Sequence, residues 1–103
     1  MANTFKNYTS SLSDATETTV YTVPASTTSV VIGLNVANTT TSQVTVSVKV
    51  AGTFLVKDAP IPAGAALSVL DGKVIAETTD TITAQSSDSS GNVDVIASVL
   101  EQT

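Results

Sequence analysis

The chain has 103 residues, of which 42% are hydrophobic, 13% charged and 4% aromatic, with a net charge of −5. This length suits one domain with a modest core, and the four basic residues do not cluster, so neither nucleic acid nor a membrane is an expected partner. The absence of cysteine excludes disulfides, thiolate metal sites and a thiol nucleophile.

The first segment, residues 1–15, is polar and weakly patterned, and Phe5, Tyr8 and Leu12 are its large apolar groups. A flexible tail has no need of such side chains, so we expect either an N-terminal arm that docks elsewhere or an irregular first strand. Residues 16–103 are expected to form a single β-sandwich domain. No secretory leader is predicted, and the longest apolar run, residues 30–34, is too short to span a membrane.

Alternating side chains predict strands along the middle of the chain. Residues 17–23 form a strand that stops at Pro24, because proline cannot continue the ladder. In residues 29–37 the pattern places Val30, Ile32, Leu34 and Val36 on one face, and Gly33 indicates a bulge or a close backbone approach. Residues 43–50 read Gln-Val-Thr-Val-Ser-Val-Lys-Val, with all four valines on one face. The short polar link between the last two strands predicts an antiparallel hairpin.

Further strands are predicted at residues 53–57, 65–70, 73–76, 81–85 and 93–100. Asp71-Gly72 is a strong two-residue hairpin signal between two of them. The final strand is apolar on both faces, which predicts a central position in a sheet or an interface. The expected fold is an all-β, antiparallel β-sandwich of the jelly-roll or immunoglobulin-like type, with about seven to eight short strands.

Several residue sets have the composition of chemical sites, but each has a simpler interpretation. The sequence has no histidine to act as the base of a hydrolytic triad, and Ser68 with Lys73 is better interpreted as a hydroxyl and a solvated lysine. The acidic residues at 71, 77 and 80 fit turns better than a glycosidase pair. Residues 88–94 resemble a shortened calcium loop but lack its terminal glutamate. We therefore predict no enzyme activity, no catalytic residues, no cofactor and no metal.

The remaining signal is a surface that binds protein. Interface hot spots favour aromatic side chains, so a partner interface is predicted at Phe5, Tyr8 and Leu12 of the first segment and at Ile96 and Leu100 of the last strand. The other two aromatic residues, Tyr21 and Phe54, are expected in the core.

Five stretches resemble a group of small structural proteins from the virions of tailed bacteriophages. They are residues 4–9 (TFKNYT), 19–25 (TVYTVPA), 31–39 (VIGLNVANT), 55–64 (LVKDAPIPAG) and 93–101 (VDVIASVLE). The similarity extends over nearly the whole chain, and most of the matching residues are of scaffold type. It carries no catalytic motif.

The resemblance implies a non-enzymatic component of the virion, assembled in the host cytoplasm. The leading hypothesis is a capsid cement or decoration protein that bridges major capsid subunits, as a small homo-oligomer. Within the same class, a neck, tail or fibre-base component is the alternative. From another class, a carbohydrate-binding β-sandwich remains open, although sugar sites rely on aromatic stacking and this chain has few aromatic residues.

Overall fold

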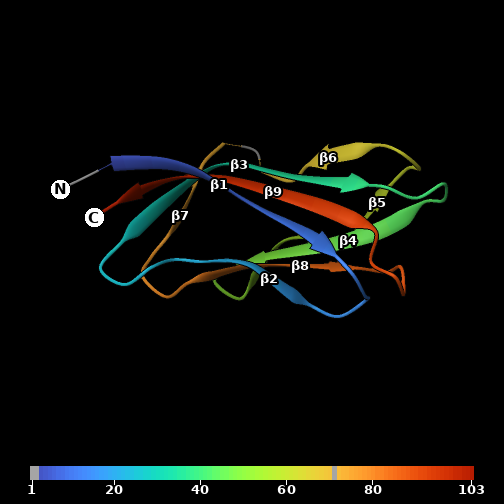
Figure 1. Ribbon diagram of the computed structural model, residues 1–103, viewed down its shortest axis with the longest axis horizontal. Coiled ribbons are helices and arrows are strands. Elements are labelled where there is room, and N and C mark those ends of the chain that lie inside the picture. Colours follow the sequence, from blue (N-terminus) through green and yellow to red (C-terminus); the bar gives the residue numbers. More distant parts are fainter. Residues whose placement is uncertain (1–2, 71) are drawn as a thin grey trace.

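The computed structural model describes residues 3–70 and 72–103, which form nine strands and no helix (Figure 1). No helix in these ranges is long and apolar enough to cross a membrane. The strands are β1 (Asn3–Leu12), β2 (Thr18–Thr22), β3 (Thr28–Asn38), β4 (Val44–Val50), β5 (Thr53–Ile61), β6 (Ala66–Ser68), β7 (Val74–Ala76), β8 (Thr81–Ser86) and β9 (Val93–Gln102).

The strands form two antiparallel sheets. The five-stranded sheet has the order β1-β9-β3-β6, with β7 also paired to β3, and the four-stranded sheet has the order β2-β8-β4-β5. Strands β6 and β7 pair with different stretches of β3, and β9 also pairs with both stretches. Because β9 occupies one edge of β3, β6 and β7 lie on the other edge and act as one interrupted strand. The predicted antiparallel β-sandwich is confirmed.

When β6 and β7 are counted as one strand, the strands form nested antiparallel pairs, in which the first strand pairs with the last and each following strand with the one before that. β1 pairs with β9, β2 with β8, β3 with β6 and β7, and β4 with β5. Alternate pairs belong to different sheets. This is the strand order of a jelly roll, one of the two sandwich types expected.

The core is aliphatic and lies between the sheets. Val44, Val46, Val48 and Val50 of β4 are all buried, as predicted from their alternation. Across the interior, β9 buries Val93, Val95, Ala97 and Val99. β9 lies between β1 and β3, so its predicted central position is confirmed (Figure 1). Each buried aliphatic side chain contributes about 1.5–3 kcal/mol relative to exposure.

A bulge in β3 changes which side chains face the core. The register with β9 shifts between Val31 and Gly33, which confirms the predicted bulge. Because one extra residue reverses the alternation, Val31 before the bulge and Leu34 after it both point inward. The predicted single phase is therefore wrong before the bulge: Val31 is fully buried, whereas Val30 and Ile32 lie on the outer face, Ile32 with 42% of its surface exposed.

The predicted hairpin between residues 29–37 and 43–50 is wrong. β3 and β4 lie in different sheets, so their apolar faces meet across the core instead of lying side by side. The link between them is anchored by buried Asn38, whose Nδ2 donates to the carbonyls of Ser42, Ile61 and Pro62 at 2.7–3.2 Å. The Oδ1 of the same side chain accepts from the backbone N–H and the hydroxyl of Thr40.

The hairpin predicted between residues 65–70 and 73–76 is also wrong, because these two segments do not pair with each other. Residues 66–68 and 74–76 pair with β3 and follow one edge in the same direction, so they do not fold back on each other. Asp71 itself lies outside the described residues. Gly72 adopts a φ of 97°, a conformation that glycine reaches without steric cost.

The first segment forms a regular strand over residues 3–12. β1 pairs with β9 without interruption, from Asn3 opposite Gln102 to Leu12 opposite Val93. The two ends of the chain therefore lie together at one end of the molecule (Figure 1).

Candidate functional site

The outer face of the five-stranded sheet carries a row of apolar side chains. In the strand register, Phe5 of β1 lies opposite Leu100 of β9, Leu100 opposite Val30 of β3, and Val30 opposite Ile75 of β7. Directly opposed residues project from the same face of a sheet. Phe5 is 72% exposed and Ile75 64% exposed, while Val30 and Leu100 are half-buried between them. We call these four residues the apolar row.

Two shallow hollows lie on this outer face, one beside the apolar row and the other further along β1 and β9. One, of about 270 Å³, lies among Phe5, Asn7, Ile32 and Ser98. The second, of about 300 Å³, is bordered by Thr9, Ser11, Asp94 and Ile96. The bulge that turns Ile32 outward adds an apolar wall to the first hollow. The face therefore has both apolar projections and depressions into which a complementary protein surface can pack.

The structure brings together three of the five residues predicted for a partner interface. Phe5, Ile96 and Leu100 all project from this outer face. Tyr8 and Leu12 point the other way, into the sandwich. Leu12 is only 3% exposed and packs in the core, so it is a core residue, because β1 is an ordered strand with its own inward face.

Sequence reasoning missed three members of this face: Val30, Ile32 and Ile75. A simple alternation places Val30 and Ile32 on the same face as Leu34 and Val36, and the bulge disrupts this alternation. Ile75 lies in a three-residue strand, too short for a periodic signal. The register between strands distant in sequence is what aligns these residues, and no local pattern contains it.

Behind the apolar row, a carboxylate is enclosed at the inner side of the same sheet. Glu101 is buried, and its Oε2 accepts hydrogen bonds of 2.7 Å from the hydroxyls of both Tyr8 and Tyr21. The two rings pack with their centroids 4.3 Å apart. The Ser29 hydroxyl lies 2.5 Å from that of Tyr21, and the Lys6 ammonium lies 3.6 Å from Glu101 Oε1. This cluster joins β1, β2, β3 and β9, and Tyr21 is a core residue as predicted.

The hydrogen bonds decide the ionisation of this cluster. Burial by itself would raise the pKa of Glu101, but hydrogen bonds from Tyr21 and Tyr8 and the Lys6 charge outweigh burial and hold the pKa below its usual value. Burial, together with the adjacent carboxylate, raises the pKa of Tyr8 and the pKa of Tyr21 to about 12. Near neutral pH the carboxylate is therefore ionised and both hydroxyls keep their protons.

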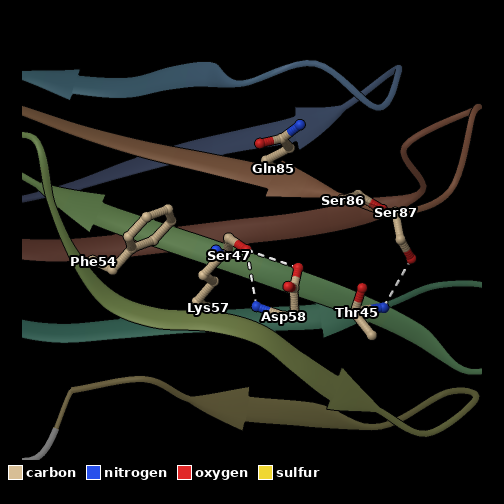
Figure 2. Close-up of a pocket in the computed structure, with 8 residues that line it drawn as sticks. All are labelled: Thr45, Ser47, Phe54, Lys57, Asp58, Gln85, Ser86 and Ser87. Atoms are coloured by element: carbon tan, nitrogen blue, oxygen red, sulfur yellow. Dashed lines mark hydrogen bonds between the residues drawn. The ribbon is translucent and has the colours of Figure 1, made fainter.

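A third hollow lies on the opposite sheet, between β4, β5 and β8 (Figure 2). It has a volume of about 170 Å³, and its eight lining residues are Thr45, Ser47, Phe54, Lys57, Asp58, Gln85, Ser86 and Ser87. The Phe54 ring is 45% exposed at its rim. The prediction that Phe54 is a core residue is wrong, because shifts in the β4–β5 register place it opposite Lys49, on the outer side of the sheet.

Several polar side chains of this hollow already have partners within the chain. Asp58 has a positive φ of 50°, and its N–H donates to the Ser47 hydroxyl at 2.9 Å (Figure 2). The ammonium groups of Lys49 and Lys57 lie 4.8 Å and 5.6 Å from the centroid of the Phe54 ring, within the range of cation–π attraction. The aromatic surface is thus partly covered by the chain's own cations.

The loop that resembles a calcium site is closed by its own hydrogen bonds. The Asp88 carboxylate accepts from the N–H of Ser90 and from the Asn92 amide. Gly91 has a φ of 73°, and a Cβ placed there would lie 2.3 Å from the Leu12 carbonyl oxygen, so this position requires glycine. Within residues 3–70 and 72–103, no three His, Cys, Asp or Glu side chains are grouped to hold a metal ion.

Comparisons with known proteins do not assign this chain to a family. A scan of the chain against protein-family models gave no match, and a search of curated proteins gave none either.

Proposed function

We propose that this chain is a structural protein of a tailed-phage virion that attaches to the capsid shell as a cement or decoration protein. In this role the apolar row and the two hollows of the same face dock on major capsid subunits. The observation that carries the proposal is the outer face itself, where four apolar side chains in register project from a sheet that is fully packed on its other side.

Exposed apolar side chains that form one contiguous patch mark interaction sites more often than scattered ones do. The row crosses four strands of one sheet, so its members are held rigidly by the backbone ladder. Ile32 shares a hollow with Phe5, and Ile96 adds an exposed apolar side chain further along β9. A rigid, preformed surface loses little conformational entropy on binding. The resemblance of residues 4–9, 19–25, 31–39, 55–64 and 93–101 to small virion proteins supplies the class of partner.

The jelly-roll strand order supports the proposal only by analogy. Jelly rolls occur in viral capsid proteins and also in lectins, and one fold serves many functions. The choice of the shell over the neck, tail or fibre base is therefore to be made by copy number. A shell protein is present in proportion to the capsid subunits, whereas a neck or tail component is present in far fewer copies.

The first decisive experiment is a reconstruction of purified phage particles, in which copies of the chain are located and counted. The second measures the binding of purified variants to shells that lack the chain. Phe5→Ser removes the most exposed member of the apolar row, and we expect it to weaken shell binding at least tenfold. Phe54→Ser is the matched control, because it removes an exposed phenyl ring from the opposite sheet. We expect the control to bind like the natural chain.

Two results would reject the role. Copies confined to the neck or tail would keep the chain in the virion but exclude a cement function. Equal binding by natural protein and Phe5→Ser would exclude the apolar row as the docking surface.

A carbohydrate-binding module is the second candidate, and the hollow beside Phe54 is the observation that favours it. An exposed ring with nearby hydroxyl, amide and carboxylate groups has the components of a sugar site (Figure 2). Its volume of about 170 Å³ is below that of ordinary ligand pockets, and two lysines already contact the ring. Glycan binding that is abolished by Phe54→Ser and retained by Phe5→Ser would establish this function in place of docking.

A further inference from the structure

We propose that two copies of this chain associate through the free edge of β1, by antiparallel pairing of one β1 with the other. The result is a single sheet that runs through both molecules. The inference does not depend on the proposed function, because it concerns the isolated chain in solution.

An edge strand exposes unpaired N–H and C=O groups, and proteins ordinarily protect such edges with prolines, bulges, charges or short strands. Three of the four edges of this sandwich show such protection. β5 contains Pro60 and register shifts, β2 has five residues and a bulge between Thr19 and Tyr21, and β6 and β7 have three residues each.

β1 has one of these defences, a single charged residue, and lacks the others. It is ten residues long, contains neither proline nor glycine, and pairs with β9 in an unbroken register. On its other side, no strand of the described residues pairs with it. Its one charged residue is Lys6, whose ammonium is directed to Glu101 at 3.6 Å. β1 is therefore a long and uninterrupted template for another strand.

Charge indicates that the occupant is a second copy. The chain has nine acidic residues and a net charge of −5, yet the sequence of β1 contains no Asp or Glu. An acidic protein that approaches another copy of itself is repelled over most of its surface. Along β1 no carboxylate of one copy opposes a carboxylate of the other, and its one lysine is paired with Glu101 of its own chain, so two β1 edges can come into contact.

The geometry of the pair is self-complementary. Antiparallel pairing of identical strands follows a two-fold axis, and each copy offers the same surface to the other. In such a pair the outward side chains of both strands stay on one face. Phe5 stands at the β1 end of the apolar row, so pairing joins the outer faces of two copies into one surface of twice the area.

The first measurement is the oligomeric state of the full chain by sedimentation across micromolar to millimolar concentrations, where we expect a monomer–dimer equilibrium. Two variants, Thr9→Pro and Ser10→Pro, then remove neighbouring N–H groups of β1. Successive residues of an edge strand direct their backbone groups alternately toward and away from the partner strand. In one of the two variants the proline replaces an N–H that bonds to β9, and this variant has a lower melting temperature. In the other variant the proline replaces an N–H that points away from β9. We expect this variant to keep a melting temperature close to that of the natural chain and to dimerise at least tenfold more weakly.

Single cysteines provide an independent readout, because the natural chain has none. Under oxidation, we expect one of Phe5→Cys, Asn7→Cys and Thr9→Cys to cross-link two copies, according to which lies nearest the two-fold axis. Thr19→Cys on the protected edge β2 is the control and stays uncross-linked.

A natural chain that is monomeric at every concentration overturns the proposal, as does a dimer unaffected by either proline. If the monomeric chain binds shells and loses this binding in the solvent-facing proline variant, the occupant of the edge is a strand of another protein and not a second copy. A β1-dependent dimer with no affinity for shells retains the inference and rejects the proposed cement function.

Discussion

Glu101 is the one buried acidic side chain among the described residues, in an interior made largely of valine, isoleucine and alanine. Burying a carboxylate is costly unless it is hydrogen-bonded. Here two tyrosine hydroxyls and one lysine supply the compensation. Because these donors come from the first two strands and the carboxylate from the last, one residue joins segments from both ends of the chain.

The Glu101 cluster predicts a specific dependence of stability on acid. Because the folded-state pKa of Glu101 lies below its usual value of 4.5, its contribution is fully present above that pH and is lost as the pH falls through the folded-state pKa. We expect Glu101→Gln to lower the free energy of unfolding by about 1–3 kcal/mol at pH 7. The difference from the natural chain should shrink below about pH 4, as measured by urea denaturation over a pH series.

Asp94→Asn is the control for this experiment. Asp94 lies on the same strand but is exposed, so its replacement should change stability by less than about 0.5 kcal/mol. Stability curves for Glu101→Gln and the natural chain that run parallel down to pH 2 would show that the cluster does not favour the ionised carboxylate.

Among the structural elements, the link between β3 and β4 determines how the sandwich closes. The side chain of Asn38 satisfies three carbonyls and accepts two hydrogen bonds. It holds residues 39–43 against the end of β5, so the chain crosses from one sheet to the other. Two apolar strands with a polar connection are equally compatible with a hairpin, and the contacts of Asn38 stabilise the crossing between sheets instead.

We predict that Asn38→Asp destabilises the protein although it preserves size and shape. The substitution keeps an acceptor for Thr40 but replaces the amide donor with a second oxygen, which leaves the carbonyls of Ser42, Ile61 and Pro62 without that donor. Each buried group that loses its partner costs about 1–3 kcal/mol. The loss is to be measured as the change in free energy of unfolding.

Asn35→Asp is the matched control, since Asn35 is exposed on the outer side of the same strand. It should leave stability within about 0.5 kcal/mol of the natural chain. Equal effects of the two substitutions would mean that the added charge, and not the lost amide donor, destabilises the fold.

At the scale of the whole molecule, the nested pairs make the fold depend on its last strand. β9 is the only described strand that pairs with β1, and it also fills one edge of β3. The hydrogen bond between Tyr8 and Glu101 joins residues separated by 93 positions. Folds built from such distant pairings form slowly, on a scale of about milliseconds to seconds, because the loops must close before the contacts can stabilise them.

We therefore predict that a chain ending at Asn92 does not fold, whereas a chain that begins at Asn7 does. The first lacks the centre of the five-stranded sheet and exposes the core faces of β3 and β1. The second loses the exposed beginning of β1 and the Lys6 charge beside Glu101, but it keeps Tyr8 and the rest of the β1–β9 pairing. Circular dichroism and the amide dispersion in NMR spectra test both, and a cooperative unfolding transition in the chain ending at Asn92 would contradict the role given to β9.

The amino-acid sequence by itself determined the class of structure and most of the strand positions. The valines of β4, the alternation in β9 and the bulge at Gly33 could all be predicted, because side-chain direction in a strand has a period of two and is a local property. The lack of histidine and cysteine and the scattered lysines likewise restrict the chemistry without any reference to the fold.

The tertiary structure alone decided which strands pair and what the surface presents. A bulge in β3 exchanged the faces of Val31 and Ile32, and the pairing of β1, β9, β3 and β7 aligned Phe5, Leu100, Val30 and Ile75. Local periodicity states that a strand has two faces but not which strand lies beside it. That choice depends on burying every apolar face at once, which is a property of the whole chain.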